Sequence, residues 1–132
     1  MQPKDLLYAK THEWVHVDRD SSQAIATVGI SHFAVEALTD LVYLELPAMG
    51  RQVKAGQSIG EIESVKAVSD LYSPVSGEVV AVNGSLPDRL SQLNDDPYGD
   101  GWIVKIKLSD EAELKNLLSH AAYEKQCEEE GH

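Results

Sequence analysis

A lysine in a turn between two alternating segments is the residue best placed for covalent chemistry. Lys66 lies in the run Glu63-Ser64-Val65-Lys66-Ala67, with Ile62 before the run and Val68 after it. This alternation predicts two strands that meet in a turn near Lys66. A lysine at a hairpin tip is exposed and identically placed in every molecule, so an enzyme can select its amine for acylation. The spacing alone suits an ordinary solvated lysine equally well, and that is the commoner case.

The residues next to this lysine have properties that a modifying enzyme can recognise. Ser64 and Ala67 are small and leave the amine accessible, and Glu63 offers a charge. Glu63, Ser64, Val65 and Ala67 are therefore the expected recognition residues around Lys66.

A second chemical motif, His12-Glu13-Trp14-Val15-His16, matches the zinc-hydrolase pattern His-Glu-x-x-His. On a helix the two histidines would share a face and could bind one ion. Here the surrounding residues alternate as in a strand, and four residues of strand separate the histidines by roughly 13 Å, too far for one zinc. No convincing third ligand follows. We therefore expect no metal site and interpret both histidines as strand residues.

The elements that must position Lys66 are mostly short strands. Alternating or β-rich segments predict strands over residues 14–17, 24–30, 41–46, 58–62, 67–72, 78–82 and 102–108. Turn signals containing glycine or proline separate the strands in the middle of the chain. Ser31 is placed to cap a short helix over residues 32–38.

The C-terminal region predicts one longer helix over about residues 110–126. Asp110 and Glu113 have the spacing of a capping box, and Leu114, Leu117, Leu118 and Ala121 share a helical face. Residues 127–132 are expected to fray because they lack an apolar face. No linker interrupts the chain, so we expect a single domain over residues 1–132.

Composition narrows the choice of partners. The 132 residues include 11 basic and 22 acidic residues, for a net charge of −11. This charge disfavours nucleic acid and anionic membranes and favours partners with basic surfaces, although it also suits simple solubility.

Cys127 is the only cysteine, so no internal disulfide can form, and the neighbouring acids are expected to raise the pKa of its thiol. The N-terminal residues lack a signal-peptide pattern, which predicts a cytoplasmic protein.

The segments around Lys66 resemble the lipoylation segment of the glycine cleavage system H protein family. The similarity covers residues 63–70 and continues through Tyr72-Ser73-Pro74-Val75-Ser76-Gly77-Glu78-Val79. Segments 12–15, 28–31, 42–47 and 94–102 also resemble the family, in the family's order. Family members commonly have glycine where this chain has Thr39, so a positive φ there would strain the turn.

The resemblance implies a fold, a cofactor and a set of partners. It implies a mainly β protein with short helices, a β-sandwich or flattened barrel of the lipoyl and biotinyl carrier type, with a C-terminal helix. Lys66 would carry covalent lipoate, added by lipoate-attaching enzymes, and Thr11, Glu13 and Asp70 would line a cleft for the aminomethyl-loaded arm. The carrier would shuttle between glycine decarboxylase, aminomethyltransferase and dihydrolipoyl dehydrogenase without catalysing a step itself. It would be a monomer, located in the cytoplasm, or in the mitochondrial matrix if a presequence has been removed.

Other carriers with a swinging arm remain alternatives. Biotinylated lysines typically sit between methionines, whereas Lys66 lies between Val65 and Ala67. Lipoyl domains of 2-oxo acid dehydrogenases are shorter and lack a counterpart of residues 95–102 and of the C-terminal helix. A lipoyl relay protein with the same fold but no part in glycine cleavage also fits the sequence.

Overall fold

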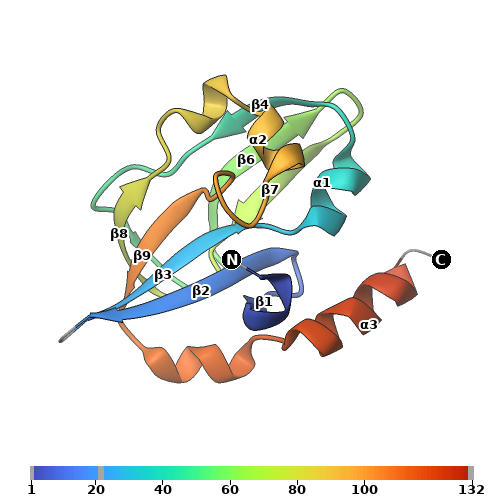
Figure 1. Ribbon diagram of the computed structural model, residues 1–132. Coiled ribbons are helices and arrows are strands. Elements are labelled where there is room, and N and C mark those ends of the chain that lie inside the picture. Colours follow the sequence, from blue (N-terminus) through green and yellow to red (C-terminus); the bar gives the residue numbers. More distant parts are fainter. Residues whose placement is uncertain (1, 21–22, 131–132) are drawn as a thin grey trace.

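The computed structural model describes residues 2–20 and 23–130, and these form nine strands, three α-helices and short 3-10 helices (Figure 1). The strands are β1 (Leu7–Tyr8), β2 (Glu13–Asp20), β3 (Gln23–Ile30), β4 (Leu41–Glu45), β5 (Gln52–Val53), β6 (Ser58–Ser64), β7 (Val68–Tyr72), β8 (Gly77–Val82) and β9 (Val104–Leu108). The α-helices are α1 (His32–Leu38), α2 (Ser91–Asp95) and α3 (His120–Glu130). The 3-10 helices are η1 (Pro3–Asp5), η2 (Leu86–Asp88) and η3 (Glu111–Asn116).

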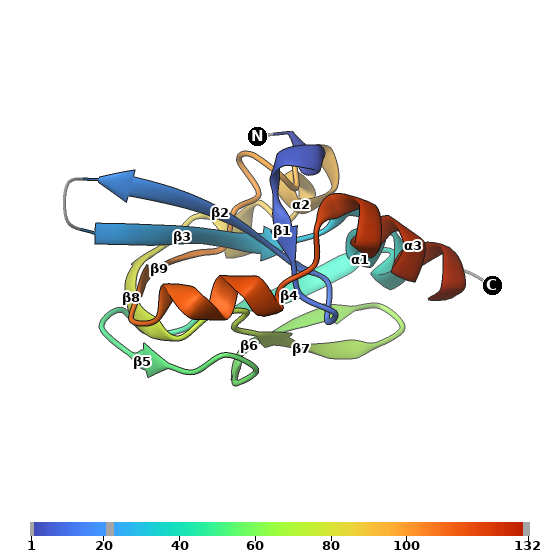
Figure 2. The same ribbon diagram turned by 90° about the horizontal axis from the view of Figure 1, so that it is seen from below.

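The described strands pair into two antiparallel sheets. Six strands follow the order β1-β2-β3-β9-β8-β5, and three follow the order β4-β6-β7. Figure 2 shows the two sheets stacked, with β6 and β7 beneath β2 and β3. The predicted β-sandwich is therefore confirmed, but it does not close into a barrel because no described strand belongs to both sheets.

Alternation along the strands places the core between the sheets. In β3, Ala26, Val28 and Ile30 are buried, and β6 contributes Ile59 and Ile62 from the opposite side. Burial of such side chains contributes roughly 1.5–3 kcal/mol each relative to leaving them in water. This core holds β6 and β7 rigidly, so the hairpin between them has a fixed platform.

The predicted helix over residues 32–38 is confirmed, together with its cap. The hydroxyl oxygen of Ser31 accepts a hydrogen bond from the Ala34 amide at 3.2 Å. The helix ends at Thr39, whose φ of 67° and ψ of −130° lie outside the regions that a side chain with a Cβ prefers. The turn does therefore need a positive φ at this position, the condition under which the sequence analysis expects Thr39 to be strained.

The predicted helix over residues 110–126 is wrong, because the chain forms two helices there. The 3-10 helix η3 ends before Leu117, and α3 begins only at His120. Between them, Leu118 exchanges two backbone hydrogen bonds with Tyr8, of 2.7 and 2.8 Å, which extends the edge of the larger sheet beyond β1. Pairing of this free strand edge outweighs continuation of the helix.

The predicted capping box is also wrong in part. The Asp110 carboxylate caps η3 by accepting from the Ala112 amide at 3.0 Å. Glu113, however, accepts from the amide and hydroxyl of Ser76, both at 2.8 Å, instead of reaching back to Asp110. Glu113 therefore ties η3 to the turn before β8.

Residues 127–130 continue α3 and do not fray; residues 131–132 lie outside the described part. Cys127 packs with Tyr98, Trp102 and Leu118 against a second apolar cluster formed by Leu6, Tyr8, Trp14 and Tyr123. Burial raises the pKa of the Cys127 thiol, and Glu130 and Glu124 raise it further, in the predicted direction. The contacts with this aromatic cluster explain why the helix extends so far.

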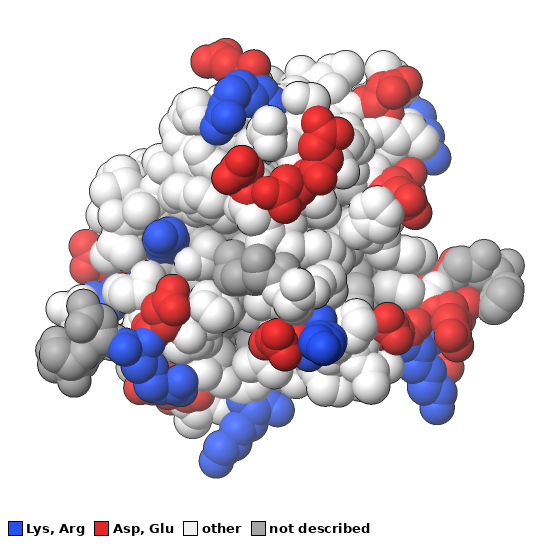
Figure 3. Space-filling model, in the orientation of Figure 1, with Lys and Arg blue, Asp and Glu red and all other residues white. Residues whose placement is uncertain are grey.

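Figure 3 shows acidic side chains gathered over α2 and the turns beside it, while basic side chains are scattered over this face. Within residues 2–20 and 23–130, no helix has the length and apolar character needed to cross a membrane.

Candidate functional site

Lys66 lies at the exposed tip of the β6–β7 hairpin, as the sequence predicts. The two strands are antiparallel, and Glu63 is the partner of Val68 at the last register position before the turn. Lys66, Val65 and Ala67 are exposed, and Glu63 is half-buried. The amine is therefore presented on a tip that projects beyond the last paired residues.

Ser64 holds the turn together, and its side chain is largely buried. Its hydroxyl oxygen accepts from the amides of Lys66 and Ala67 at 3.3 and 3.1 Å. The Ser64 amide also donates to the Ala67 carbonyl at 2.8 Å, and the Val65 amide donates to the Asp40 carbonyl at 3.0 Å. These bonds satisfy backbone groups that a tight turn leaves without partners.

A cavity of about 340 Å³ lies at the same end of the molecule. It brings together Thr11, Glu13 and Asp70, the three residues expected to line the arm-binding cleft, although 57 residues separate Glu13 from Asp70. Its apolar wall comes from α1, β3 and β6 and consists of Ile30, Phe33, Ala34, Ala37, Leu38 and Ile62. A cavity with one apolar wall and three carboxylates, those of Glu13, Asp70 and Glu130, suits an aliphatic chain that ends in a cation.

Glu13 forms the buried floor of this cleft, with only 1% of its surface exposed. Its carboxylate accepts hydrogen bonds from the Thr11 hydroxyl and, at 3.2 Å, from the Tyr72 amide. Burial raises the pKa of Glu13 to about 7, although these two hydrogen bonds pull it down. The Tyr72 bond joins the start of β2 to the end of β7, and it therefore links the cleft floor to the lysine-bearing hairpin.

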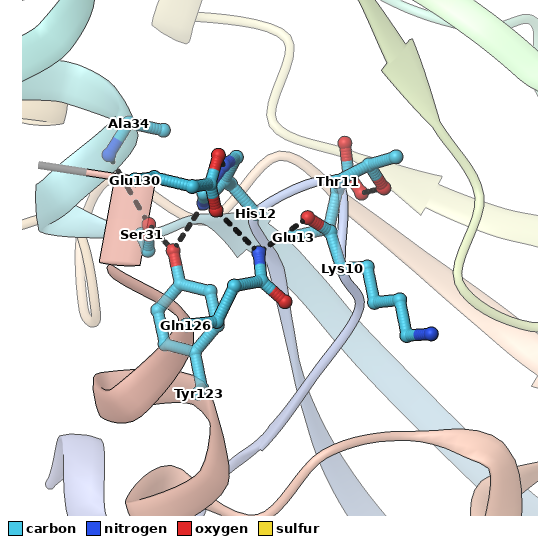
Figure 4. Close-up of polar contacts among 9 residues, drawn as sticks. All are labelled: Lys10, Thr11, His12, Glu13, Ser31, Ala34, Tyr123, Gln126 and Glu130. Atoms are coloured by element: carbon cyan, nitrogen blue, oxygen red, sulfur yellow. Dashed lines mark hydrogen bonds and ion pairs between the residues drawn. The ribbon is translucent and has the colours of Figure 1, made fainter. Parts of the chain in front are cut away.

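The C-terminal helix closes one side of this cleft, which the sequence analysis did not predict (Figure 4). The Tyr123 hydroxyl hydrogen-bonds to Ser31 Oγ at 2.5 Å and to His12 Nδ1 at 2.6 Å. Glu130 lines the cleft and lies 3.3 Å from His12 Nε2. The Gln126 amide donates to the Lys10 carbonyl at 2.8 Å. Glu130 falls in the segment 127–132 that the sequence analysis expects to fray, whereas Tyr123 and Gln126 lie within the predicted helix, whose docking on the cleft has no local sequence signal.

The two histidines of the His-Glu-x-x-His motif have separate surroundings. His16 lies in β2, as predicted, and its Nε2 is 3.1 Å from Asp18 Oδ1. His12 precedes β2 and has a φ of 82°, so its assignment to the strand is wrong. The Ser31 amide donates to the His12 carbonyl, which fixes this turn beside α1. In the described part of the chain, no group of three or more potential metal ligands occurs.

A lysine on the exposed tip of a hairpin in a β-sandwich is the arrangement expected of a swinging-arm carrier protein. The sequence profile described as "Glycine cleavage H-protein" matches residues 6–130. The chain is 58% identical to the glycine cleavage system H protein of Rhodopirellula baltica, over 98% of this chain and 97% of that one. Its identity to the H protein of Carboxydothermus hydrogenoformans is 51%, covering 98% and 96% of the two chains. The chain therefore belongs to the glycine cleavage H-protein family, the lipoyl carriers of the glycine cleavage system.

The fold supports the same assignment. The crystal structure of a glycine cleavage system H protein from Mycobacterium marinum superposes with a TM-score of 0.83 at 40% identity. The match covers 95% of this chain and 98% of that one. Both sheets and the C-terminal helix thus belong to a known architecture.

Proposed function

We propose that Lys66 carries the lipoyl group and that the protein is a carrier without catalytic activity of its own. The observation that carries the proposal is the exposed position of Lys66 on a turn whose backbone is fixed by Ser64 and Asp40. Such a turn restricts the attachment point while the long side chain stays free to move. The lipoyl group would supply, when bound, a cyclic disulfide that opens to take an aminomethyl unit on one sulfur. After that unit has left, the dithiol that remains would pass on electrons and close again to the disulfide.

The proposed partners are glycine decarboxylase, aminomethyltransferase and dihydrolipoyl dehydrogenase, with the protein acting as a cytoplasmic monomer. Attachment to Lys66 keeps the dithiol at a high effective concentration near each successive active site. The net charge of −11 favours enzymes with basic surfaces around those sites.

The cleft beside the hairpin is proposed to shelter the aminomethyl-loaded arm. Its apolar wall would contact the aliphatic part of the arm, and the carboxylates of Glu13 and Asp70 would face the terminal ammonium group. Charge-assisted hydrogen bonds of this kind are the strongest available to the site. A cation close to Glu13 would also lower the pKa of that carboxyl, so the buried group would ionise when the arm enters.

Reconstitution with the three purified enzymes tests the proposed function. Lipoylated protein should support glycine cleavage, whereas the Lys66→Arg variant should support none. Lys54→Arg, a conservative change on another exposed lysine, serves as the matched control and should retain full activity. Cleavage that persists with Lys66→Arg would refute the proposal.

The same system tests the cleft separately. The double variant Glu13→Gln, Asp70→Asn should accept lipoate normally but shorten the lifetime of the aminomethyl-loaded protein. An unchanged lifetime would leave both residues outside the binding of the arm.

A lipoyl relay protein remains the second candidate. It would accept lipoate on Lys66 and pass it to other proteins, yet fail to support glycine cleavage in the reconstituted system. High identity to H proteins over nearly the full chain favours the carrier of glycine cleavage.

A further inference from the structure

Exposed apolar side chains are concentrated around the lysine-bearing hairpin. Within the described residues, the large exposed hydrophobic side chains are Val42, Tyr43, Met49, Val65 and Val68. All except Met49 belong to the hairpin or to the neighbouring strand β4, and their exposed fractions run from 44% for Tyr43 to 68% for Val65. Contiguous exposed apolar side chains often mark a surface that contacts another protein.

The strand register places these side chains beside one another. Tyr43 is the partner of Glu63, which is the partner of Val68, so the three lie in one row across the smaller sheet. In the next row Leu44 and Ile62 are buried and Ser69 is exposed, whereas Tyr43 and Val68 are 44% and 61% exposed and thus face outward. Val65 follows in the turn, and Val42 lies at a bulge in β4. We call Val42, Tyr43, Val65 and Val68 the hairpin patch.

A row of carboxylates borders the hairpin patch. Glu45 is the partner of Glu61, and Glu61 is the partner of Asp70. Like charges directly opposite one another on neighbouring strands destabilise a sheet. Strands β4, β6 and β7 contain no Lys or Arg to offset the repulsion, and none of these three carboxylates forms an ion pair within the described residues. Asp70 also lines the arm-binding cleft, but Glu45 and Glu61 remain paired like charges, and a basic partner would offset the cost of this arrangement.

We propose that the hairpin patch and its acidic border form the docking surface for the enzyme that attaches lipoate to Lys66. The matching surface would have an apolar centre and a rim of Lys or Arg side chains. This inference rests on the proposed function, and it extends the contact from the turn itself to β4 and to Val68 at the start of β7.

The length of the lysine side chain distinguishes the attaching enzyme from the other partners. A lysine Nζ lies only about 6 Å from its own Cα, so an enzyme that acylates Nζ must cover the hairpin tip. An enzyme that acts on the far end of the attached arm has no such need. In the attachment step, Nζ loses two of its three protons and forms an amide bond with the carboxyl carbon of a lipoyl-adenylate. The bond between that carbon and the phosphate oxygen breaks, and AMP leaves.

The experiment measures lipoylation of the full-length unmodified protein by a lipoate–protein ligase supplied with lipoate, ATP and Mg²⁺, followed by intact-mass spectrometry. Val65→Ser with Val68→Ser, and separately Tyr43→Ser, should each lower kcat/KM for this protein substrate at least ten-fold, mainly through a higher KM. Met49→Ser, the exposed hydrophobic residue outside the patch, is the matched control and should leave the rate unchanged. Unfolding curves confirm that each variant is folded, and the single Tyr43 change provides a test if the double variant is unstable.

The acidic border has its own test. Because exposed charges are screened by salt, the KM of the unchanged protein should rise with ionic strength, and Glu45→Gln with Glu61→Gln should flatten that dependence. Equal rates for patch variants and unchanged protein would overturn the inference, as would equal losses in Met49→Ser. Normal lipoylation combined with impaired glycine cleavage would assign the patch to the catalytic enzymes and would also overturn it. Absence of lipoylation in the unchanged protein would instead refute the proposed function.

Discussion

Glu13 makes the stability of the fold depend on pH in a direction opposite to that of most carboxylates. The side chain is 1% exposed, and burial raises its pKa from 4.5 to about 7. Between these two values the folded state therefore holds a proton that the unfolded state has lost. The favourable contribution is fully present below pH 4.5 and disappears as the pH rises through 7.

The magnitude follows from the two pKa values. One pKa unit corresponds to about 1.4 kcal/mol, so ionisation of Glu13 in the fold costs about 3 kcal/mol at pH 8. Glu13→Gln should remove this cost because an amide reproduces the protonated carboxyl. Its oxygen can accept from the Tyr72 amide and its NH₂ can donate to the Thr11 hydroxyl oxygen, the two groups that now bind the carboxylate.

Urea unfolding of both proteins between pH 4.5 and 8 measures the effect. The free energy of unfolding of Glu13→Gln minus that of the unchanged protein should increase by about 3 kcal/mol across this range. Subtraction cancels the contributions of the histidines and the other acids, which both proteins share. NMR titration of the Glu13 side chain provides an independent value near 7. A difference that stays constant with pH would contradict the assignment of a buried carboxyl to the cleft floor.

Three further predictions concern local features of the fold. Thr39→Gly should raise the free energy of unfolding by about 1 kcal/mol, because glycine relieves the strained φ of 67°. Thr39→Ala keeps a Cβ and should not raise it, and urea unfolding of the two variants measures the difference. Tyr123→Phe should lower the free energy of unfolding by about 1–3 kcal/mol, because the hydrogen bonds of the hydroxyl to Ser31 and His12 are lost. Amide hydrogen exchange in α3 should become faster, and unchanged exchange would mean that these bonds do not hold the helix. Lys66→Ala should change the free energy of unfolding by less than about 0.5 kcal/mol, because the side chain is exposed, and a several-fold larger loss would make the lysine structural.

Local sequence signals predicted the parts of the molecule that local interactions determine. Alternation identified the β6–β7 hairpin and its lysine, and the Ser31 cap marked the start of α1. The strained turn at Thr39 was predicted by comparison with a family in which glycine is common. In each case the residues that make the structure lie within a few positions of one another.

The C-terminal region could not be predicted in the same way because tertiary contacts determine it. Leu118 pairs with Tyr8, more than 100 residues away, and this pairing interrupts a sequence whose apolar spacing suits one continuous helix. Tyr123 belongs to the apolar cluster with Leu6, Tyr8 and Trp14, and Cys127 packs against it, so this part of the helix depends on residues of the N-terminal segment. The contact of Glu130 with the cleft and that of Gln126 with Lys10 depend on the same docking. The register that aligns Tyr43, Glu63 and Val68 likewise appears only in the folded sheet.

Peptide mapping of the lipoylated protein tests the central claim most directly. Protein incubated with a lipoate–protein ligase, lipoate and ATP is digested, and the position of the lipoyl group is read by tandem mass spectrometry. One lipoyl group should be found, on Lys66, and Lys66→Arg should acquire none. Modification of another lysine, or modification that persists in Lys66→Arg, would contradict the assignment of Lys66 as the carrier residue.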